Sequence, residues 1–288
     1  MNQRLKGVLY TLAAGLIYGF TPILCAITYQ NGNDALSMTF FRNLLILPFL
    51  AWMLYKDKIS LRLEGGKVLP VLLTALFGTL LTTLLLYGSY VYIGVGTATS
   101  LHFFYPVLVT LVCLWIYHDR IEAKQWQALL LGTVGVLILI DPSSKANLIG
   151  IALALGSACT FSLYLVIIEK KRLSRLPGPL LAFWLCMFVS VVLAIQSLFL
   201  VPIVWVQPLG NYLLMLVVSF LVAFVALSFL QKGIGILGSS QAALFSLSEP
   251  LSSIVFGILF LKEEFSLVKL AGCVLILGGV LLLAKKKT

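Results

Sequence analysis

The sequence has little charge for its length. Only 10% of its 288 residues are Asp, Glu, Lys or Arg, whereas a soluble domain is about a quarter charged. Hydrophobic residues make up 61% of the chain, and the mean hydropathy is +1.08. A chain this apolar belongs in a lipid bilayer, so we expect an all-α integral membrane protein.

The sequence also lacks the motifs of several enzyme classes. No HExxH, GxSG or GxxxxGK[ST] pattern occurs, which disfavours a zinc peptidase, a rhomboid-like serine protease and an ATP-driven pump. The five cysteines form no CxxC pair and no Cys/His cluster, so we expect no disulfide framework, no metal site and no cofactor. We predict no catalytic residue, and an intramembrane enzyme stays a weak alternative.

Ten apolar runs follow one another along the chain, each near the ~20 residues that a bilayer demands. The first run is longer than the core of a signal peptide, so we expect it to stay in place as a transmembrane helix. The ten predicted helices span residues 5–28, 36–55, 68–93, 97–117, 125–140, 147–168, 178–200, 210–231, 236–261 and 266–284.

The positive charges lie mainly on one side of these predicted helices. With the N-terminus in the cytoplasm, sixteen Lys and Arg residues fall on the cytoplasmic side and three outside. This bias predicts a multi-pass protein of the cytoplasmic (inner) membrane with both termini in the cytoplasm. The net charge of +10 is then a topology signal, and we expect no nucleic-acid partner.

The second half of the sequence repeats the first. A shift of 144 residues places Gly94 on Gly238 and Pro106 on Pro250 without a gap. We therefore predict two five-helix repeats, which pack as one bundle around a central cavity. Because five is odd, the second repeat enters the membrane inverted, an arrangement typical of transporters that alternate between inward-open and outward-open states. A static bundle built by duplication is the alternative.

The repeats are predicted at residues 1–142 and 147–288, with a short external linker near 141–147. Their motifs resemble the EamA-type transporters of the drug/metabolite transporter superfamily, and the resemblance covers both halves. It implies ten helices, cytoplasmic termini and a central cavity. The chain departs from the family at Asp119, where the fourth helix usually closes with Glu, although Glu263 fills the equivalent place in the second half. The motifs are RNLLILPFL, FFYPVLVTL, SEPLSSIVFGILFLKEE and LAGCVLILGGVLLLA.

Glu249 and Arg42 are the charged residues expected inside the bilayer. An ionised carboxylate at the centre of a span costs ~3 kcal/mol on insertion scales, so Glu249 must protonate, pair or face water. It is a candidate for contact with substrate or protons, and a helix cap is the alternative. Arg42 is suited to gripping a carboxylate, or its long stem could reach the interface.

The fourth and ninth predicted helices carry equivalent prolines, Pro106 and Pro250, which we expect to kink helices that line the cavity. An i, i+3 spacing places His102 with Tyr105, and Ser246 with Glu249, on shared helix faces. His102 could titrate near neutral pH, donate to an anionic substrate or simply pack. The predicted substrate-binding residues are Glu249, Arg42, His102, Tyr18, Tyr105, Phe161, Trp184, Phe245 and Ser246, and further aromatic candidates for the cavity wall are Tyr87, Tyr90, Tyr164 and Phe224.

These residues favour a secondary transporter of a small metabolite. A cavity that contains the acid Glu249, the base Arg42, the imidazole of His102 and aromatic walls would fit an amino acid or a related amphoteric compound. We expect export by alternating access, with proton coupling left open. A carrier of organic cations, nucleobases or cofactors is the alternative. The expected partners are a small-molecule substrate, the lipid bilayer and protons, and the chain would act as a monomer or homodimer.

Overall fold

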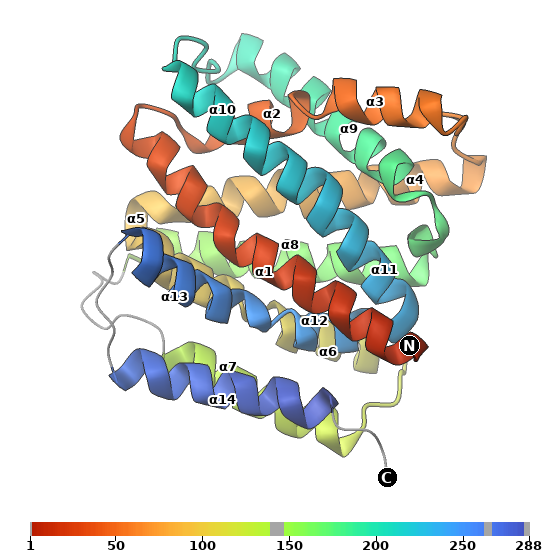
Figure 1. Ribbon diagram of the computed structural model, residues 1–288, viewed down its shortest axis with the longest axis vertical. Coiled ribbons are helices and arrows are strands. Elements are labelled where there is room, and N and C mark those ends of the chain that lie inside the picture. The colour runs from red at the N-terminus through yellow and green to blue at the C-terminus, as the bar shows by residue number, and fades with distance from the viewer. Residues whose placement is uncertain (1, 139–146, 262–266, 285–288) are drawn as a thin grey trace.

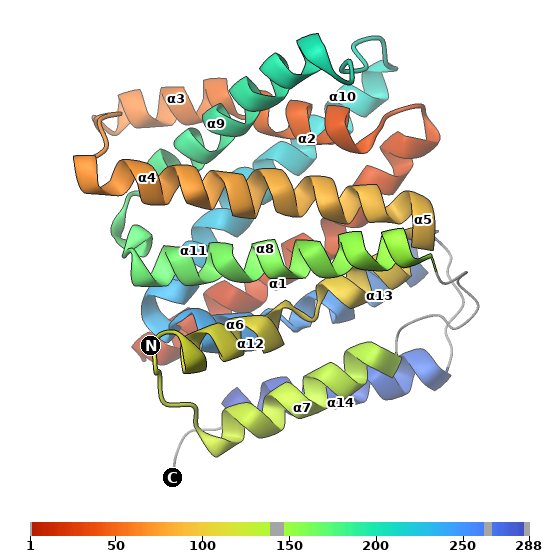
Figure 2. The ribbon, with the colours of Figure 1, turned by 180° about the vertical axis from the view of Figure 1, so that it is seen from behind.

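The computed structural model describes residues 2–138, 147–261 and 267–284, and every regular element in these ranges is a helix (Figures 1 and 2). Most of the predicted linker at 141–147 and all of Glu263 lie outside these ranges. The elements are α1 (Gln3–Gln30), α2 (Ala35–Leu44), α3 (Leu47–Lys56), α4 (Gly65–Thr74), η1 (Ala75–Leu81), α5 (Thr82–His102), α6 (Tyr105–Trp115), α7 (Ala123–Ile138), α8 (Leu148–Lys170), η2 (Leu173–Arg175), α9 (Gly178–Phe199), α10 (Leu209–Val218), η3 (Ser219–Ala226), α11 (Leu227–Leu237), α12 (Ser239–Phe245), α13 (Ser248–Leu261) and α14 (Leu267–Ala284).

Seven helical stretches of the described residues are long and apolar enough to cross a membrane. The chain is therefore an all-α integral membrane protein. The remaining predicted runs differ in length: α7 has 16 residues, the apolar part of α14 covers Leu270–Leu282, and the run at 236–261 is divided between α12 and α13. The seven stretches are Gln3–Gln30, Ala35–Lys56, Gly65–Ile93, Thr97–Trp115, Leu148–Lys170, Gly178–Phe199 and Leu209–Leu237.

The two repeat-related prolines begin new helices, and the expectation that they kink continuous helices is wrong. Helix α5 ends at His102, and α6 starts at Tyr105 with Pro106 in its first turn. Likewise α12 ends at Phe245, and Pro250 is the third residue of α13. Proline lacks an N–H and disfavours helical geometry in the residue before it, so it fits best in a first helical turn. The chain therefore breaks instead of bending.

Two π-helical stretches occupy equivalent places in the two halves. Stretch η1 begins at Ala75 and η3 at Ser219, 144 residues later. At the end of η1 the Phe77 carbonyl accepts both the backbone N–H and the hydroxyl of Thr82, five residues later, the hydroxyl at 2.6 Å. Such wide turns are rare and often occur at functional sites. No local feature of the sequence predicted them.

Packing brings together segments that are far apart in sequence. Helix α1 lies against α11 and α13, α5 against α8, and α7 against α14. Both views show α7 and α14 as an outer pair at one edge of the bundle (Figures 1 and 2). The two halves of the chain therefore pack against each other in one bundle.

Two glycines on α1 allow α13 to approach closely. A Cβ atom at Gly15 would lie 2.3 Å from Ser248 Oγ, and one at Gly19 would lie 1.8 Å from Ser252 Oγ and 2.3 Å from the Glu249 carbonyl oxygen. The spacing of these glycines is the GxxxG pattern of close helix pairs in membranes. Both are buried. The pair therefore sets the position of the first turn of α13, which carries Glu249.

We predict that Gly19→Ala destabilises the protein by about 1–3 kcal/mol, because the new methyl group overpacks against the backbone of α13. The measurement is the thermal unfolding midpoint of the purified protein in detergent. The control is Gly210→Ala, whose added Cβ meets no atom within 4 Å and which should leave the midpoint unchanged or slightly raised. Equal midpoints for the two variants would show that α1 and α13 are not in close contact.

Candidate functional site

A cavity of about 130 Å³ lies inside the bundle. A single water molecule needs about 10–15 Å³ of such a cavity, so there is room for several waters or a small ligand. Its walls come from α1, α2, η1, α5, α8, α9, η3, α11 and α13. The lining residues are Tyr18, Thr21, Pro22, Arg42, Asn43, Gly78, Thr79, Thr82, Thr83, Leu86, Tyr87, Tyr90, Thr99, His102, Phe103, Phe161, Tyr164, Leu185, Cys186, Val222, Ala223, Leu227, Glu249 and Ser253.

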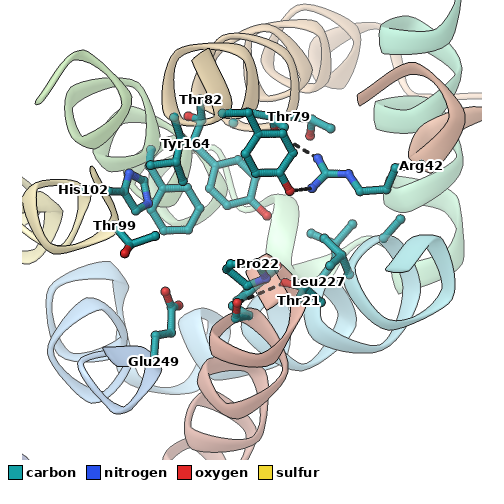
Figure 3. A pocket seen from close by; sticks show the side chains of 18 of the residues that line it. Thr21, Pro22, Arg42, Thr79, Thr82, Thr99, His102, Tyr164, Leu227 and Glu249 are labelled. Carbon is teal, nitrogen blue, oxygen red and sulfur yellow. Dashed lines mark hydrogen bonds between the residues drawn. The ribbon is translucent and has the colours of Figure 1, made fainter. Parts of the chain in front are cut away.

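Arg42 supplies a buried cation on one side of the cavity (Figure 3). It is 7% exposed. Its Nη2 donates to Thr83 Oγ1 at 2.9 Å and its Nη1 to the Tyr87 hydroxyl at 3.3 Å, while Nε has no partner among the described residues. The stem does not carry the guanidinium out to the interface. Arg42 is instead held by neutral oxygens, and it keeps its charge, its Nε–H and the second hydrogen of each Nη for another partner.

Two further polar atoms near this cation are buried without a hydrogen bond to any described residue. They are Asn43 Oδ1, beside Arg42 in sequence, and the Tyr90 hydroxyl, whose ring lies 5.5 Å from that of Tyr87. Buried polar atoms in proteins are nearly always paired, and each unpaired one costs about 1–3 kcal/mol. This part of the wall therefore has the capacity to bind water or a polar ligand group.

Glu249 supplies a carboxylate elsewhere on the wall (Figure 3). It lies in the first turn of α13 and is 5% exposed. Its Oε1 accepts a long hydrogen bond, 3.4 Å, from the Tyr105 hydroxyl. The partial positive charge of the helix N-terminus favours an anion at this position. No cation pairs with Glu249 among the described residues, and no carboxylate pairs with Arg42.

His102 is the last residue of α5 and lines the same cavity. Its Nδ1 lies 2.8 Å from Ser157 Oγ. Its ring packs between the rings of Tyr105 and Phe161, at centroid distances of 5.4 and 5.3 Å. The helix break at Phe103 and Phe104 places His102 and Tyr105 together, although they belong to different helices.

Aromatic side chains form much of the remaining wall. Phe161 and Tyr164 stack with centroids 5.3 Å apart, and Tyr18 and Tyr87 line the cavity with them. Aromatic faces attract cations and pack well against apolar groups. The wall can therefore contact both the charged and the apolar parts of a small molecule.

Four of the predicted substrate-binding residues do not line this cavity. Tyr105 lies behind the wall and reaches Glu249 with its hydroxyl. Phe245 and Ser246 are buried at the end of α12 and just after it. Trp184 is turned toward the α3–α4 connection, where its indole N–H donates to the Leu61 carbonyl at 2.9 Å. Sequence spacing alone did not show which face of each helix meets the cavity.

A group of threonines on the wall was not among the residues predicted from the sequence. Thr83 holds Arg42, and Thr82 contacts Thr160 at 2.7 Å between hydroxyl oxygens. Thr79 lines the cavity from η1. The available signal was a run of hydroxyl residues at 79, 82 and 83 within an apolar span, since polar groups in lipid favour a protein interior. Their link to Arg42 could not be seen without the packing.

Polar residues also join the two halves at one end of the bundle. We call Cys113, Asp119, Glu169, Lys170 and Ser239 the Glu169 cluster. Lys170 Nζ lies 2.5 Å from Asp119 Oδ2 and 3.6 Å from Glu169 Oε1. Ser239 donates its N–H and its hydroxyl to Glu169 Oε2, at 2.6 and 2.5 Å, and its Oγ lies 3.3 Å from Cys113 Sγ. The cluster ties α6 to α8 and α12.

A second group, the Asn211 cluster, consists of Thr28, Asn31, Asn33, Gln207 and Asn211. Asn31 Nδ2 donates to Asn211 Oδ1 at 3.3 Å, and Gln207 Nε2 donates to Asn33 Oδ1 at 3.1 Å. Asn211 Nδ2 donates to the Thr28 carbonyl at 3.4 Å and to Gln207 Oε1 at 3.1 Å. Figure 1 shows the starts of α10 and α12 at opposite sides of the bundle, so the two clusters join the halves at opposite ends.

Among the described residues, no group of three or more His, Cys, Asp or Glu side chains has an arrangement that could hold a metal ion. The arrangement is a small cavity with the guanidinium of Arg42 and the carboxyl group of Glu249 on its wall.

Comparison with solved structures supports the fold. A crystal structure of another protein superposes with a TM-score of 0.81, at 16% sequence identity, covering 96% of this chain and 98% of that one. At this identity the likeness concerns the fold alone.

Comparison of sequences identifies the family. The uncharacterized transporter YvbV of Bacillus subtilis is 31% identical over 228 residues, 73% of this chain and 71% of its own length. The uncharacterized inner membrane transporter YicL of Salmonella typhimurium is 26% identical over 304 residues, 99% and 97% of the two chains. The uncharacterized transporter sll1319 of Synechocystis is 24% identical over 322 residues, 99% and 95% of the two chains. The EamA-like transporter family matches twice, at residues 5–141 and 148–285, and the chain belongs to this family of membrane transporters.

Proposed function

We propose that the chain is a secondary transporter that exports a small amphoteric metabolite, most simply an amino acid, by alternating access. The observation that carries this proposal is that Arg42 and Glu249 are buried in the wall of one cavity, and neither pairs with an opposite charge among the described residues. A zwitterion would offer its carboxylate to Arg42 and its ammonium to Glu249.

The energetics favour a ligand with both charges. A buried charge without a partner costs several kcal/mol, and a hydrogen bond to a charged group contributes about 1.5–3 kcal/mol. An amphoteric ligand would compensate both residues and remain neutral overall. A simple anion or cation would compensate one residue and leave the other. The cavity volume of about 130 Å³ suits a small molecule.

The proposed architecture is ten transmembrane helices in two inverted repeats, residues 1–142 and 147–288. The π-helical stretches that begin at Ala75 and Ser219, 144 residues apart, support this repeat, and so does the double match to the family. The asymmetry of Lys and Arg supports an inner-membrane protein with both termini in the cytoplasm. The start of α1 and the end of α14 lie at the same side of the bundle in Figure 1, in agreement with that orientation.

Alternating access needs contacts that close each end of the cavity in turn. The Glu169 cluster would close the cytoplasmic end and the Asn211 cluster the external end. Export is proposed from the family resemblance, and proton coupling from the position of Glu249. Since one chain surrounds the cavity, the proposed pathway is complete in a monomer, and a homodimer would hold two such pathways.

A carrier of organic cations is the second candidate. The observation that favours it is the aromatic wall beside Glu249, formed by Tyr18, Phe161 and Tyr164, because aromatic faces and a carboxylate together attract cations. Arg42 would repel an organic cation, so an amphoteric substrate fits the cavity better.

We predict saturable flux of at least one of the twenty standard L-amino acids in proteoliposomes that contain the purified full chain. Arg42→Gln should lower that flux about 10- to 100-fold, because it removes one hydrogen bond between charged groups, which contributes about 1.5–3 kcal/mol. Trp184→Phe, a change away from the cavity wall, should leave it within about twofold. Unfolding midpoints of both variants check that they fold. Strong flux of organic cations with no saturable amino-acid flux would favour the second candidate.

A second prediction concerns the coupling role of Glu249. Glu249→Gln should abolish accumulation driven by a pH gradient and leave exchange of substrate across the membrane measurable, because the amide cannot carry a proton. The measurement compares the two fluxes in the same proteoliposomes, and a charge moved through 100 mV is worth about 2.3 kcal/mol. Equal accumulation by Glu249→Gln and the parent protein would remove this residue from proton coupling.

A third prediction concerns the Glu169 cluster. Glu169→Gln weakens the two hydrogen bonds from Ser239, so the cytoplasmic end should open more often. In a variant that retains Cys113 as its sole cysteine, the rate of maleimide labelling of Cys113 should rise about tenfold, as expected for the loss of ~1.4 kcal/mol. The control is Asn211→Ala, which weakens the opposite end and should not raise the rate. Equal effects of both changes would contradict separate closures at the two ends.

A further inference from the structure

The hydrogen bond between His102 and Ser157 determines which nitrogen of the imidazole carries the proton. Ser157 Oγ lies 2.6 Å from the Ala154 carbonyl oxygen and donates its one hydrogen to it. The same Oγ lies 2.8 Å from His102 Nδ1, so it must accept a hydrogen from Nδ1. In a neutral imidazole the other nitrogen, Nε2, then has a lone pair and no hydrogen.

The environment of His102 keeps this arrangement in place. Ser157 is fully buried, and the imidazole is confined between Tyr105 and Phe161. His102 lines the cavity, and its Nε2 makes no hydrogen bond to any described residue. The ring nitrogen of His102 that is left for a further partner is therefore a hydrogen-bond acceptor, in contrast to the donor role considered from the sequence.

His102 and Glu249 are both neighbours of Tyr105. The Tyr105 hydroxyl bonds to Glu249 Oε1, and its ring packs on the imidazole. Figure 3 shows the two side chains on the same side of the cavity, with Arg42 across from them. One side of the cavity thus offers two acceptors, and the other offers the donors of Arg42.

We propose that His102 Nε2 and Glu249 together accept hydrogen bonds from a primary ammonium group, so that the site selects primary amines against quaternary ammonium compounds. A primary ammonium has three N–H donors and can satisfy both acceptors. A quaternary ammonium has none, so it would leave His102 Nε2 without a hydrogen bond and Glu249 with only the one from Tyr105. Sites built around hydrogen bonds reject ligands that lack the donor by large factors. This proposal rests on the proposed function and specifies the amine end of its substrate.

The first experiment measures binding to the full chain in lipid nanodiscs. The probes are the amino acid that binds best among the twenty standard ones and its N,N,N-trimethyl derivative. The parent protein should prefer the primary amine by about tenfold or more. His102→Phe keeps the shape of the ring and removes the acceptor, so the preference should fall by at least about threefold. His102→Gln supplies an amide oxygen and should restore part of it.

A preference that is unchanged in His102→Phe would overturn this inference and leave the amphoteric transporter intact, since Glu249 alone or steric exclusion would then explain it. Failure of every amino acid to bind, with binding of quaternary cations, would overturn the proposed function and this inference together. The two failures are therefore distinguishable.

The second experiment reads the tautomer directly and needs no substrate. The chain has two histidines, so His118→Asn leaves His102 as the sole one for ¹⁵N-histidine labelling. Asparagine suits position 118 because the backbone there has φ 54°. Nuclear magnetic resonance of this protein should show a protonated Nδ1 and an unprotonated Nε2, and Ser157→Ala should increase the Nε2-protonated form. An unprotonated Nδ1 in the parent background would overturn the inference.

Discussion

The burial of two ionisable side chains, Arg42 and Glu249, in the wall of one cavity is the constraint on which the rest of the structure depends. A charge in the interior of a membrane protein must be paired, hydrated or used. The surrounding groups supply no opposite charge: the neutral oxygens of Thr83 and Tyr87 accept hydrogen bonds from Arg42, and Glu249 accepts a single long hydrogen bond from Tyr105. A transporter of amphoteric molecules can use two such charges, because its substrate pairs with both and then leaves.

The backbone places these groups by interrupting its helices. The break between α5 and α6 brings His102 beside Tyr105, and the break between α12 and α13 sets Glu249 in a first helical turn. Glycines at 15 and 19 let α1 lie against that turn. Irregular backbone inside a membrane is tolerated where it is buried in protein or lines a cavity, and these breaks lie beside the cavity.

The sequence predicted an all-helical membrane protein. It also predicted that Arg42, Glu249 and His102 line one cavity, because a polar side chain in an apolar span is costly to expose to lipid and therefore faces the protein interior. It did not predict that Trp184 would face away, because the direction of a helix face depends on packing between distant segments. It had no signal for the π-helical stretches. Its error about Pro106 and Pro250 has a simple origin, since a proline in an apolar run is compatible with either a kink or a new helix start.

The most direct measurement of the central claim is a double-mutant cycle that combines a change in the ligand with a change in the protein. The dissociation constants of the best-binding amino acid and of its carboxamide are measured with the parent protein and with Arg42→Gln. If Arg42 binds the carboxylate, amidation weakens binding to the parent protein by about tenfold or more and changes binding to the variant by less than about twofold. The same loss in both proteins would contradict the account.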